Sequence, residues 1–202
     1  MNLIVPSNRP TKAALRAHLR AQLRMLGPEQ RSEESTRLCD QVRQFVVWRD
    51  ARRVLLFAPL PDEPDVWPLA LEAVKAGKEV GLPSYDPVRN RYGARQVRDP
   101  GLDLVAGEFG VREPRHDCPE VALATLDLVL VPGLGFSTEG GRLGRGGGFY
   151  DRLLAATDAV RVGVGLDEQI VPWLPLEPHD AQLHFVVTPS GIHTVARSRS
   201  GF

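Results

Sequence analysis

The chain has 202 residues, which is enough to bury a core without help from metals or disulfides. Lys and Arg together number 25, as do Asp and Glu, so the zero net charge gives no sign of binding to nucleic acid or to a membrane surface over the whole molecule. The two cysteines, Cys39 and Cys118, are far apart and form no Cys-x-x-Cys pair, so we expect buried or inert thiols rather than a disulfide framework or a structural zinc site.

Targeting and membrane signals are not evident in the sequence. The first residues lack the charged start and apolar run of a signal peptide, and no apolar stretch approaches the ~20 residues of a membrane span. We therefore expect a soluble, cytoplasmic protein.

The first predicted element is an amphipathic helix over residues 11–26, with Thr11 as its N-cap and a Gly-Pro pair as its stop. Its leucines recur at helical spacing and predict a face packed on the core. Its basic residues repeat at every fourth position, at Lys12, Arg16, Arg20 and Arg24. A solvated face is the favoured interpretation of the last two.

The next elements predict a strand, a helix and a strand in succession. A second helix is expected over residues 29–45. The continuous apolar run at 52–60 ends in a proline-rich turn, as is typical of a buried parallel strand. A helix over 65–76 ends at Gly77, and residues 78–83 read as another strand. This order indicates a βαβ unit.

Residues 84–120 are expected to be irregular, because only residues 94–97 resemble a strand. A long insertion in a compact domain is more often functional than idle. Regular structure returns with the buried strand predicted at 126–133, which a glycine-rich loop follows directly. A helix is then expected from residue 149.

The rest of the chain predicts strands at 160–165 and 184–188, an edge strand at 191–196, and a short turn or helix at 167–172 between them. These elements together favour an α/β fold with a mostly parallel central sheet flanked by helices, in a Rossmann-like three-layer arrangement. We expect one domain over residues 1–202, with both ends of the chain frayed, at 1–10 and 196–202.

The glycine-rich loop, "GRLGRGGGFYDR" at residues 141–152, leaves a parallel strand and enters a helix, which is where open α/β sheets bind ligands. Free N–H groups in the first turn of a helix favour an anion. Glycines let the backbone approach phosphate oxygens, and Arg142 and Arg145 add forked donors. The loop therefore predicts a polyphosphate cradle.

The loop fits neither of two common phosphate-binding patterns. It lacks the Gly-Lys-Ser/Thr ending of a Walker A loop, and Phe149 stands where a Gly-x-Gly-x-x-Gly pattern needs its last glycine. Asp151 follows the loop. It is either a magnesium ligand beside the phosphates or an ordinary aspartate in the first turn of a helix, and spacing alone leaves both readings open.

The stretch from Asp127 to Leu154 closely resembles the signature of the 5-formyltetrahydrofolate cyclo-ligases, which are also called 5,10-methenyltetrahydrofolate synthetases. Weaker resemblance is found in "KAALR" at 12–16, Asp62-Glu63, "LPSY" at 82–85, "GEFGVREP" at 107–114 and "EPHD" at 177–180. The resemblance implies an enzyme that uses ATP and Mg²⁺ to cyclise 5-formyltetrahydrofolate to 5,10-methenyltetrahydrofolate, releasing ADP and phosphate. The reaction is expected to pass through a phosphorylated formyl group, an iminium phosphate.

The resemblance also implies roles for single residues. The nucleotide would bind to Lys12, Arg16, Arg142, Leu143, Gly144, Arg145, Gly146, Gly147, Gly148, Phe149 and Tyr150. Arg145 would be catalytic by neutralising charge on the transferring phosphoryl group, and it would also contact the substrate. The folate would be recognised further by Glu63, Tyr85 and Phe109, although both aromatic residues could equally be ordinary core residues.

Asp151 and Asp180 are the metal ligands that the resemblance implies. Two positions depart from the family pattern. His184 stands where a second acidic residue is common after "EPHD", which puts a second metal carboxylate in doubt. Tyr92 replaces a hydrophobic residue that is often Met, which puts the wall of the folate pocket in doubt.

Other functions remain as alternatives on a similar scaffold. One is a sugar-phosphate isomerase or CoA transferase, which would not require ATP. Another is an inactive cyclo-ligase-like domain that binds RNA through the basic residues of the first helix. The zero net charge and the intact loop count against RNA binding. We expect a monomer that binds a small-molecule folate, with one or several glutamates, and no nucleic acid or membrane.

Overall fold

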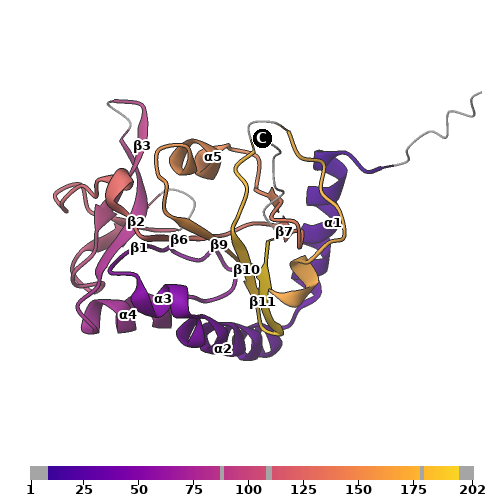
Figure 1. Ribbon diagram of the computed structural model, residues 1–202, viewed down its shortest axis with the longest axis horizontal. Helices are drawn as coiled ribbons and strands as arrows, with labels where there is room; N and C mark the ends of the chain where they lie inside the picture. Colours follow the sequence, from indigo (N-terminus) through magenta and orange to yellow (C-terminus); the bar gives the residue numbers. More distant parts are fainter. Residues whose placement is uncertain (1–8, 87–88, 108–110, 178–179, 196–202) are drawn as a thin grey trace, which may run out of the picture.

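The computed structural model describes residues 9–86, 89–107, 111–177 and 180–195. Within these ranges, seven strands form one sheet in the order β11-β10-β9-β6-β1-β2-β3 (Figure 1). In chain order they are β1 (Arg53–Leu55), β2 (Glu79–Asp86), β3 (Arg91–Gln96), β6 (Leu128–Val131), β9 (Val160–Val164), β10 (Phe185–Thr188) and β11 (Gly191–Thr194). The five inner strands are parallel, and both edge strands, β3 and β11, are antiparallel to their neighbours.

Helices cover both faces of this sheet (Figure 1). They are α1 (Lys12–Met25), α2 (Pro28–Gln44), α3 (Val46–Asp50), α4 (Trp67–Lys75) and α5 (Phe149–Leu154), with 3-10 turns η2 (Leu123–Thr125) and η3 (Asp167–Gln169). The helices α2, α3 and α4 lie on one face and α5 lies on the other, whereas α1 packs against η3 and the chain segments that follow β6 and β9. The predicted α/β fold with three layers is therefore confirmed. None of the helices in the described ranges is long and apolar enough to cross a membrane.

The inner strands are apolar on both faces because helices bury both faces. Val54 and Leu128 point into the core shared with α2, α3 and α4. Their chain neighbours Leu55 and Val129 point into the opposite core, shared with α5. This two-sided burial explains why the sequence shows continuous apolar runs here instead of alternation.

The helix predicted at residues 11–26 is confirmed as α1. The hydroxyl of Thr11 accepts a hydrogen bond from the N–H of Ala14 at 3.2 Å, as an N-cap does. Cys39 and Cys118 are free and buried as expected, and burial raises the pKa of the Cys39 thiol to about 11, which keeps it protonated. The expected fraying of 1–10 and 196–202 falls almost wholly outside the described residues.

The irregular structure expected over residues 84–120 is wrong in large part. The strand β2 continues to Asp86 and pairs with β3, and a separate hairpin joins β4 (Leu104–Ala106) to β5 (Arg112–Pro114). Most side chains of β3 are exposed or half-buried, because this strand forms an edge of the sheet. It therefore lacks the apolar run that marks an inner strand. The short helix α3 was not predicted either, since it follows α2 almost without a break.

The glycine-rich loop is anchored on the sheet by one aromatic side chain. After β6, the chain forms a hairpin of β7 (Gly135–Phe136) and β8 (Arg142–Leu143). The ring of Phe136 is completely buried, and three glycines make room for it. A Cβ built on each would lie within 3.0 Å of the ring, at Gly133, Gly163 and Gly165.

We predict that Gly165→Ala destabilises the protein, because its new Cβ would lie 2.6 Å from Cε2 of Phe136. Overpacking of this kind costs about 1–3 kcal/mol in free energy of unfolding, which urea denaturation would measure. The control is Gly93→Ala in β3, where a Cβ would meet nothing within 4 Å. Equal stability of the two variants would contradict the anchoring role of Phe136.

Candidate active site

A cavity of about 540 Å³ opens at the carboxyl ends of the neighbouring parallel strands β6, β1 and β2. Its walls come from the loop after β1, the second half of β2, the glycine-rich loop after β6 and the first turns of α1. This volume lies in the range of pockets that hold one small molecule. The loops that the sequence singled out therefore meet at one place, although they are far apart in the chain.

The glycine-rich loop presents unpaired backbone donors to this cavity. Gly146 and Gly148 have φ angles of +112° and +63°, which side-chain-bearing residues rarely adopt. None of the backbone N–H groups of residues 145–148 donates a hydrogen bond to another described residue. The chain then enters α5. The loop thus holds several N–H groups that are available to an anion.

Arg145 ties the glycine-rich loop to the loop after β1. Its two terminal nitrogens donate to the carboxylate of Asp62 at 2.6 and 3.2 Å, and its Nε donates to Oε1 of Glu63 at 3.0 Å. Three of the five guanidinium N–H groups are therefore used in ion pairs. The Arg145 side chain is 31% exposed, so the remaining donors reach the cavity.

Glu63 lies in the wall of the cavity and is only 6% exposed. Its other oxygen, Oε2, accepts a hydrogen bond from the N–H of Leu60 at 3.0 Å. Burial raises the pKa of Glu63 above the ordinary value for a glutamate, although Leu60 and Arg145 oppose this shift. The carboxylate is thus a buried acceptor held in place from two sides.

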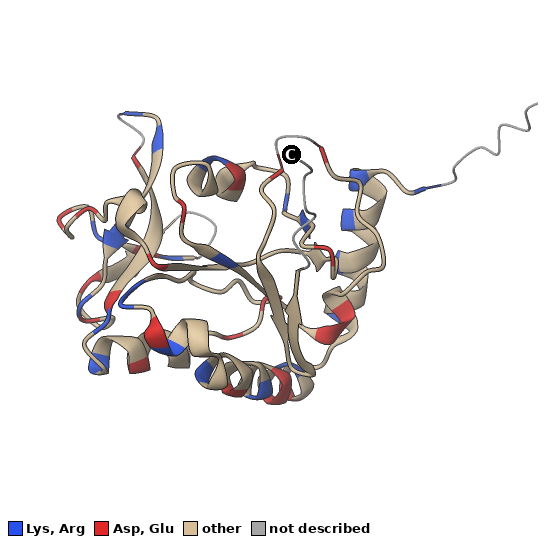
Figure 2. Cartoon of the chain, in the orientation of Figure 1, with Lys and Arg blue, Asp and Glu red and all other residues tan. Residues whose placement is uncertain are grey.

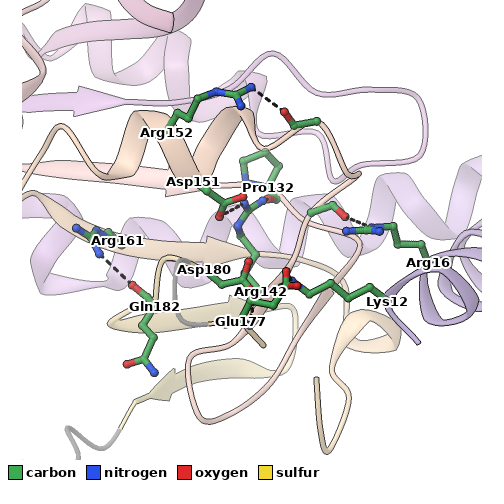
Figure 3. Close-up of polar contacts among 12 residues, drawn as sticks. Lys12, Arg16, Pro132, Arg142, Asp151, Arg152, Arg161, Glu177, Asp180 and Gln182 are labelled. Atoms are coloured by element: carbon green, nitrogen blue, oxygen red, sulfur yellow. Dashed lines mark hydrogen bonds and ion pairs between the residues drawn. The ribbon is translucent and has the colours of Figure 1, made fainter. Parts of the chain in front are cut away.

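Arg142 is buried and lies beside Asp151 and Pro132 (Figure 3). Its guanidinium donates to Oδ1 of Asp151 at 3.0 Å and to the carbonyl oxygen of Pro132 at 3.2 Å, and it lies 5.5 Å from the ring centre of Tyr150. Its buried Nε has no acceptor among the described residues. Desolvation and the nearby charge of Glu63 raise the pKa of Tyr150 well above its usual value, so this hydroxyl stays neutral.

The first turns of α1 bring further cations to the same cavity (Figure 3). Lys12 donates to Oε2 of Glu177 at 2.5 Å and to Oδ2 of Asp180 at 2.8 Å. Burial alone would lower the pKa of Lys12, but the hydrogen bonds to the two carboxylates outweigh it and raise the pKa. Arg16 donates to the carbonyl oxygen of Gly144 at 2.9 Å.

Arg20 also contacts the loop, which corrects its assignment to a solvated face. Its side chain donates to the carbonyl oxygen of Arg145 at 3.3 Å, and the residue is half-buried. Only Arg24 of the basic stripe is exposed, as predicted. Leucines hold the helix α1 against the hairpin of β7 and β8, since Leu19 packs in one cluster with Leu143 of β8.

An aromatic cluster forms the side of the cavity near β2. Tyr85 lines the cavity and is 38% exposed, so it is not an ordinary core residue. Its ring centre lies 5.0 Å from that of Tyr92, which lies 4.6 Å from that of Phe149. The guanidinium of Arg152 lies 4.4 Å from the Tyr92 ring centre. Tyr92 therefore supports Tyr85 from behind, and Phe109 lies outside the described residues.

The two expected metal ligands, Asp151 and Asp180, line the same cavity. Among the described residues, no group of three or more His, Cys, Asp or Glu side chains is arranged to hold a metal. His184 does not line the cavity. Its Nδ1 accepts a hydrogen bond from the backbone N–H of Arg161 at 2.9 Å, which is a structural contact at the sheet.

Sequence reasoning missed three functional candidates. Asp62 forms an ion pair with Arg145, and Glu177 forms one with Lys12. Both acidic residues lie in motifs that the sequence analysis quoted, but neither was assigned a role. Arg152 donates to the carbonyl oxygen of Gly147 at 2.8 Å and so steadies the loop from the following helix. Their positions in "DE", "EPHD" and "FYDR" were the available signal, but their partners are set by the tertiary fold.

These features define an α/β protein with a cavity suited to an anionic small molecule at the carboxyl ends of its parallel strands. A sequence model of the 5-formyltetrahydrofolate cyclo-ligase family matches residues 8–189. The 5-formyltetrahydrofolate cyclo-ligase of Escherichia coli is 34% identical over 178 residues, covering 86% of this chain and 98% of that protein. That of Mus musculus is 31% identical over 189 residues, covering 87% and 92%.

The solved structures agree. The 5,10-methenyltetrahydrofolate synthetase of Aquifex aeolicus has a TM-score of 0.84 at 30% identity, covering 95% of this chain and 96% of that chain. The synthetase of Mycoplasma pneumoniae, with a TM-score of 0.72 at 18% identity, shares the fold. The chain belongs to the 5-formyltetrahydrofolate cyclo-ligase family, whose activity is an ATP-dependent cyclisation.

We predict a pH-dependent effect of Glu63→Gln on stability. A raised pKa means that the stabilising contribution of the acid is complete below its unfolded pKa, near 4.5, and is lost as the pH rises through the folded pKa. The free energy of unfolding of the wild type minus that of the variant should therefore fall as the pH rises above about 4.5. Urea denaturation at several pH values measures this difference.

Glu72→Gln serves as the control with the opposite sign. A hydrogen bond from Arg43 lowers the pKa of Glu72, so the same difference should rise with pH there. If the difference in free energy of unfolding between wild type and variant rises with pH for both variants, the pKa of Glu63 is not raised by burial.

Proposed function

We propose that this chain catalyses the ATP-dependent cyclisation of 5-formyltetrahydrofolate to 5,10-methenyltetrahydrofolate, with release of ADP and phosphate. One observation carries the proposal beyond family membership. The unpaired N–H groups of residues 145–148 lie in the same cavity as Glu63, a buried carboxylate suited to a flat heterocycle with N–H donors. A polyphosphate and a folate can thus be bound side by side.

The chemistry explains the need for ATP. A formamide oxygen is a poor leaving group, so the formyl oxygen first attacks the γ-phosphorus and ADP leaves. The folate nitrogen N10 then attacks the formyl carbon and loses its proton. Departure of phosphate, which carries the former formyl oxygen, closes the methenyl bridge. The protein must hold the two substrates in line and stabilise charge on the transferring group.

We assign the nucleotide phosphates to the loop at residues 143–150, with Lys12, Arg16 and Arg142 around it. The N–H groups at 145–148 have no other acceptor among the described residues, and the glycines leave no Cβ in the way. Arg142 offers a guanidinium whose Nε lacks an acceptor within the described chain. These donors are of the kind that bind phosphate oxygens.

Arg145 is the residue we assign to the transferring phosphoryl group. In the free protein its charge is balanced by Asp62 and Glu63. An incoming phosphate would draw the guanidinium from Asp62, whose side chain is 28% exposed, more readily than from the buried Glu63. Because Arg145 stays linked to Glu63, the residue that senses the phosphate also touches the residue proposed to hold the pterin.

We propose Asp151 and Asp180 as magnesium ligands, because both line the cavity and offer the oxygen donors that Mg²⁺ prefers. Magnesium usually takes only one or two protein carboxylates beside phosphates and waters, so the described residues fit it without a larger cluster. When bound, the ion would neutralise charge on the phosphates. Asp151 would then share its charge between the ion and Arg142.

On the folate side, we propose that Glu63 accepts hydrogen bonds from the pterin and that Tyr85 packs against it. Phe109 keeps the role that the family resemblance implies. Tyr92 departs from the family pattern but contacts Tyr85 and Phe149, so it completes the aromatic wall without entering the cavity. We expect this departure to leave folate binding intact.

We further propose that the chain acts as a single domain and a monomer in the cytoplasm, without nucleic acid or membrane partners. The contacts of α1 weaken the alternative of RNA binding. Three of the four basic residues on this helix, Lys12, Arg16 and Arg20, donate hydrogen bonds to residues of the proposed site. Lys and Arg are also interspersed with Asp and Glu along the helices α2 and α4 (Figure 2). A sugar-phosphate isomerase or a CoA transferase would not require ATP, so the omission of ATP from the assay below tests this alternative.

The test is the ultraviolet absorbance of methenyl-folate after mixing the protein with 5-formyltetrahydrofolate, ATP and Mg²⁺. A rise that disappears when any one component is omitted supports the proposal. A rise without ATP, or no rise from folded protein, would refute it.

We predict that Arg145→Ala lowers kcat/KM in this assay by about 10³-fold or more, because an arginine at the transferring phosphoryl group contributes on that order. The matched control is Arg24→Ala on the exposed side of α1, which should retain full activity. Full activity of the Arg145 variant would remove this residue from the mechanism.

A further inference from the structure

A second cavity, of about 590 Å³, adjoins the first. Its walls come from the start of α2, the loop between β1 and α4, and β5. The two cavities share the residues Ala58, Leu60, Glu63 and Arg112. A ligand held at Glu63 can therefore extend from one cavity into the other, past Arg112.

Arg112 differs from the other cations that line either cavity. Within the described residues its side chain forms no hydrogen bond and no ion pair, and its guanidinium lies 5.7 Å from the ring centre of Trp67. By contrast, Lys12, Arg142 and Arg145 are each paired with a carboxylate. Arg112 is exposed and its donors have no acceptor in the described part of the chain, so they are available to an anionic ligand.

A second arginine adds positive charge to this cavity. Arg31 donates to the backbone carbonyl oxygens of Leu23, Leu26 and Pro61, and forms no ion pair in the described part of the chain. The acidic residues that face the cavity are Glu63, which is paired with Arg145, and Asp65, which accepts a hydrogen bond from the N–H of Trp67 at 2.9 Å. Two arginines thus face the cavity, and neither forms an ion pair with its two carboxylates within the described residues.

Most of the remaining lining is apolar or aromatic. It includes Trp67 and two prolines of the loop after β1, Pro59 and Pro61. Such surfaces suit a flat, uncharged ring, whereas the arginines suit carboxylates. The cavity thus combines, next to Glu63, an apolar wall for a ring and donors for an acid.

We propose that the second cavity binds the tail of the folate, with Arg112 donating to a glutamate carboxylate and Trp67 bordering the aminobenzoyl ring. This inference rests on the proposed function, because it takes the pterin to lie at Glu63. It makes Arg112 a determinant of specificity for the acidic tail of the substrate. Additional glutamates could reach the second arginine of the lining, Arg31, and would then bind more tightly.

The experiment compares Arg112→Ala and Arg112→Lys with the wild type. We expect KM for 5-formyltetrahydrofolate to rise about threefold to tenfold in the alanine variant, as for the loss of one exposed charge-assisted pair, with kcat and KM for ATP unchanged. The lysine variant should recover part of the loss. The advantage of a triglutamate over a monoglutamate substrate should shrink in the alanine variant.

Arg115→Ala is the matched control, since Arg115 lies just after β5, is paired with Asp117 at 2.8 and 2.9 Å, and lines neither cavity. It should leave every constant unchanged. An unchanged KM for folate in the Arg112 variant, or a rise in KM for ATP in its place, would overturn the inference.

Calorimetric titration of each protein with 5-formyltetrahydrofolate alone separates this inference from the proposed reaction. Folate binding that weakens in Arg112→Ala upholds the tail site even if the wild type shows no turnover. Turnover by the wild type with equal folate affinity in both proteins upholds the reaction and refutes the tail site. A wild type that does not bind folate at all refutes both.

Discussion

The ion pairs of Arg145 with Asp62 and Glu63 are the interaction on which the proposed site depends. They join the loop after β6 to the loop after β1, two segments about eighty residues apart in the chain. Glu63 is buried, and a buried carboxylate is tolerated when it is paired and hydrogen-bonded. The same pairs therefore fix the shape of the cavity. They also hold Arg145 in place in the free protein, before a phosphate binds.

The cavity repeats this arrangement with its other cations. Arg142 is paired with Asp151, and Lys12 with Asp180, so positive and negative side chains are paired around the proposed anion site. Such a balance stabilises the free protein, because no bare cluster of like charges faces the cavity. Binding of a polyphosphate together with a divalent cation would give phosphate oxygens to the basic side chains and the cation to the acidic side chains. The backbone N–H groups of the glycine-rich loop have no acceptor among the described residues, so they could bind a phosphate without first leaving another partner.

The sequence predicted what depends on local patterns. Apolar runs identified the inner strands, and the density of glycines identified the loop, because the positive φ angles of Gly146 and Gly148 favour that residue. The edge strand β3 was missed, since half-exposed strands carry no apolar run. Arg20 was misassigned because a helix pattern shows which residues share a face but not which loop packs against it. Asp62 was named only as part of a motif, since its pairing with Arg145 arises from tertiary structure.

We propose that Arg145 breaks its ion pair with Asp62 when it binds phosphate. The affinity of the Asp62→Asn variant for nucleotide tests this exchange most directly. Removing one of the two carboxylates that compete for the guanidinium should tighten binding of ATP with Mg²⁺ by about threefold or more, measured by calorimetry in the absence of folate. A tighter Kd in the variant than in the wild type supports the exchange of partners. An unchanged or weaker Kd would contradict it, because Arg145 would then be either already available to the phosphate or not involved in binding it.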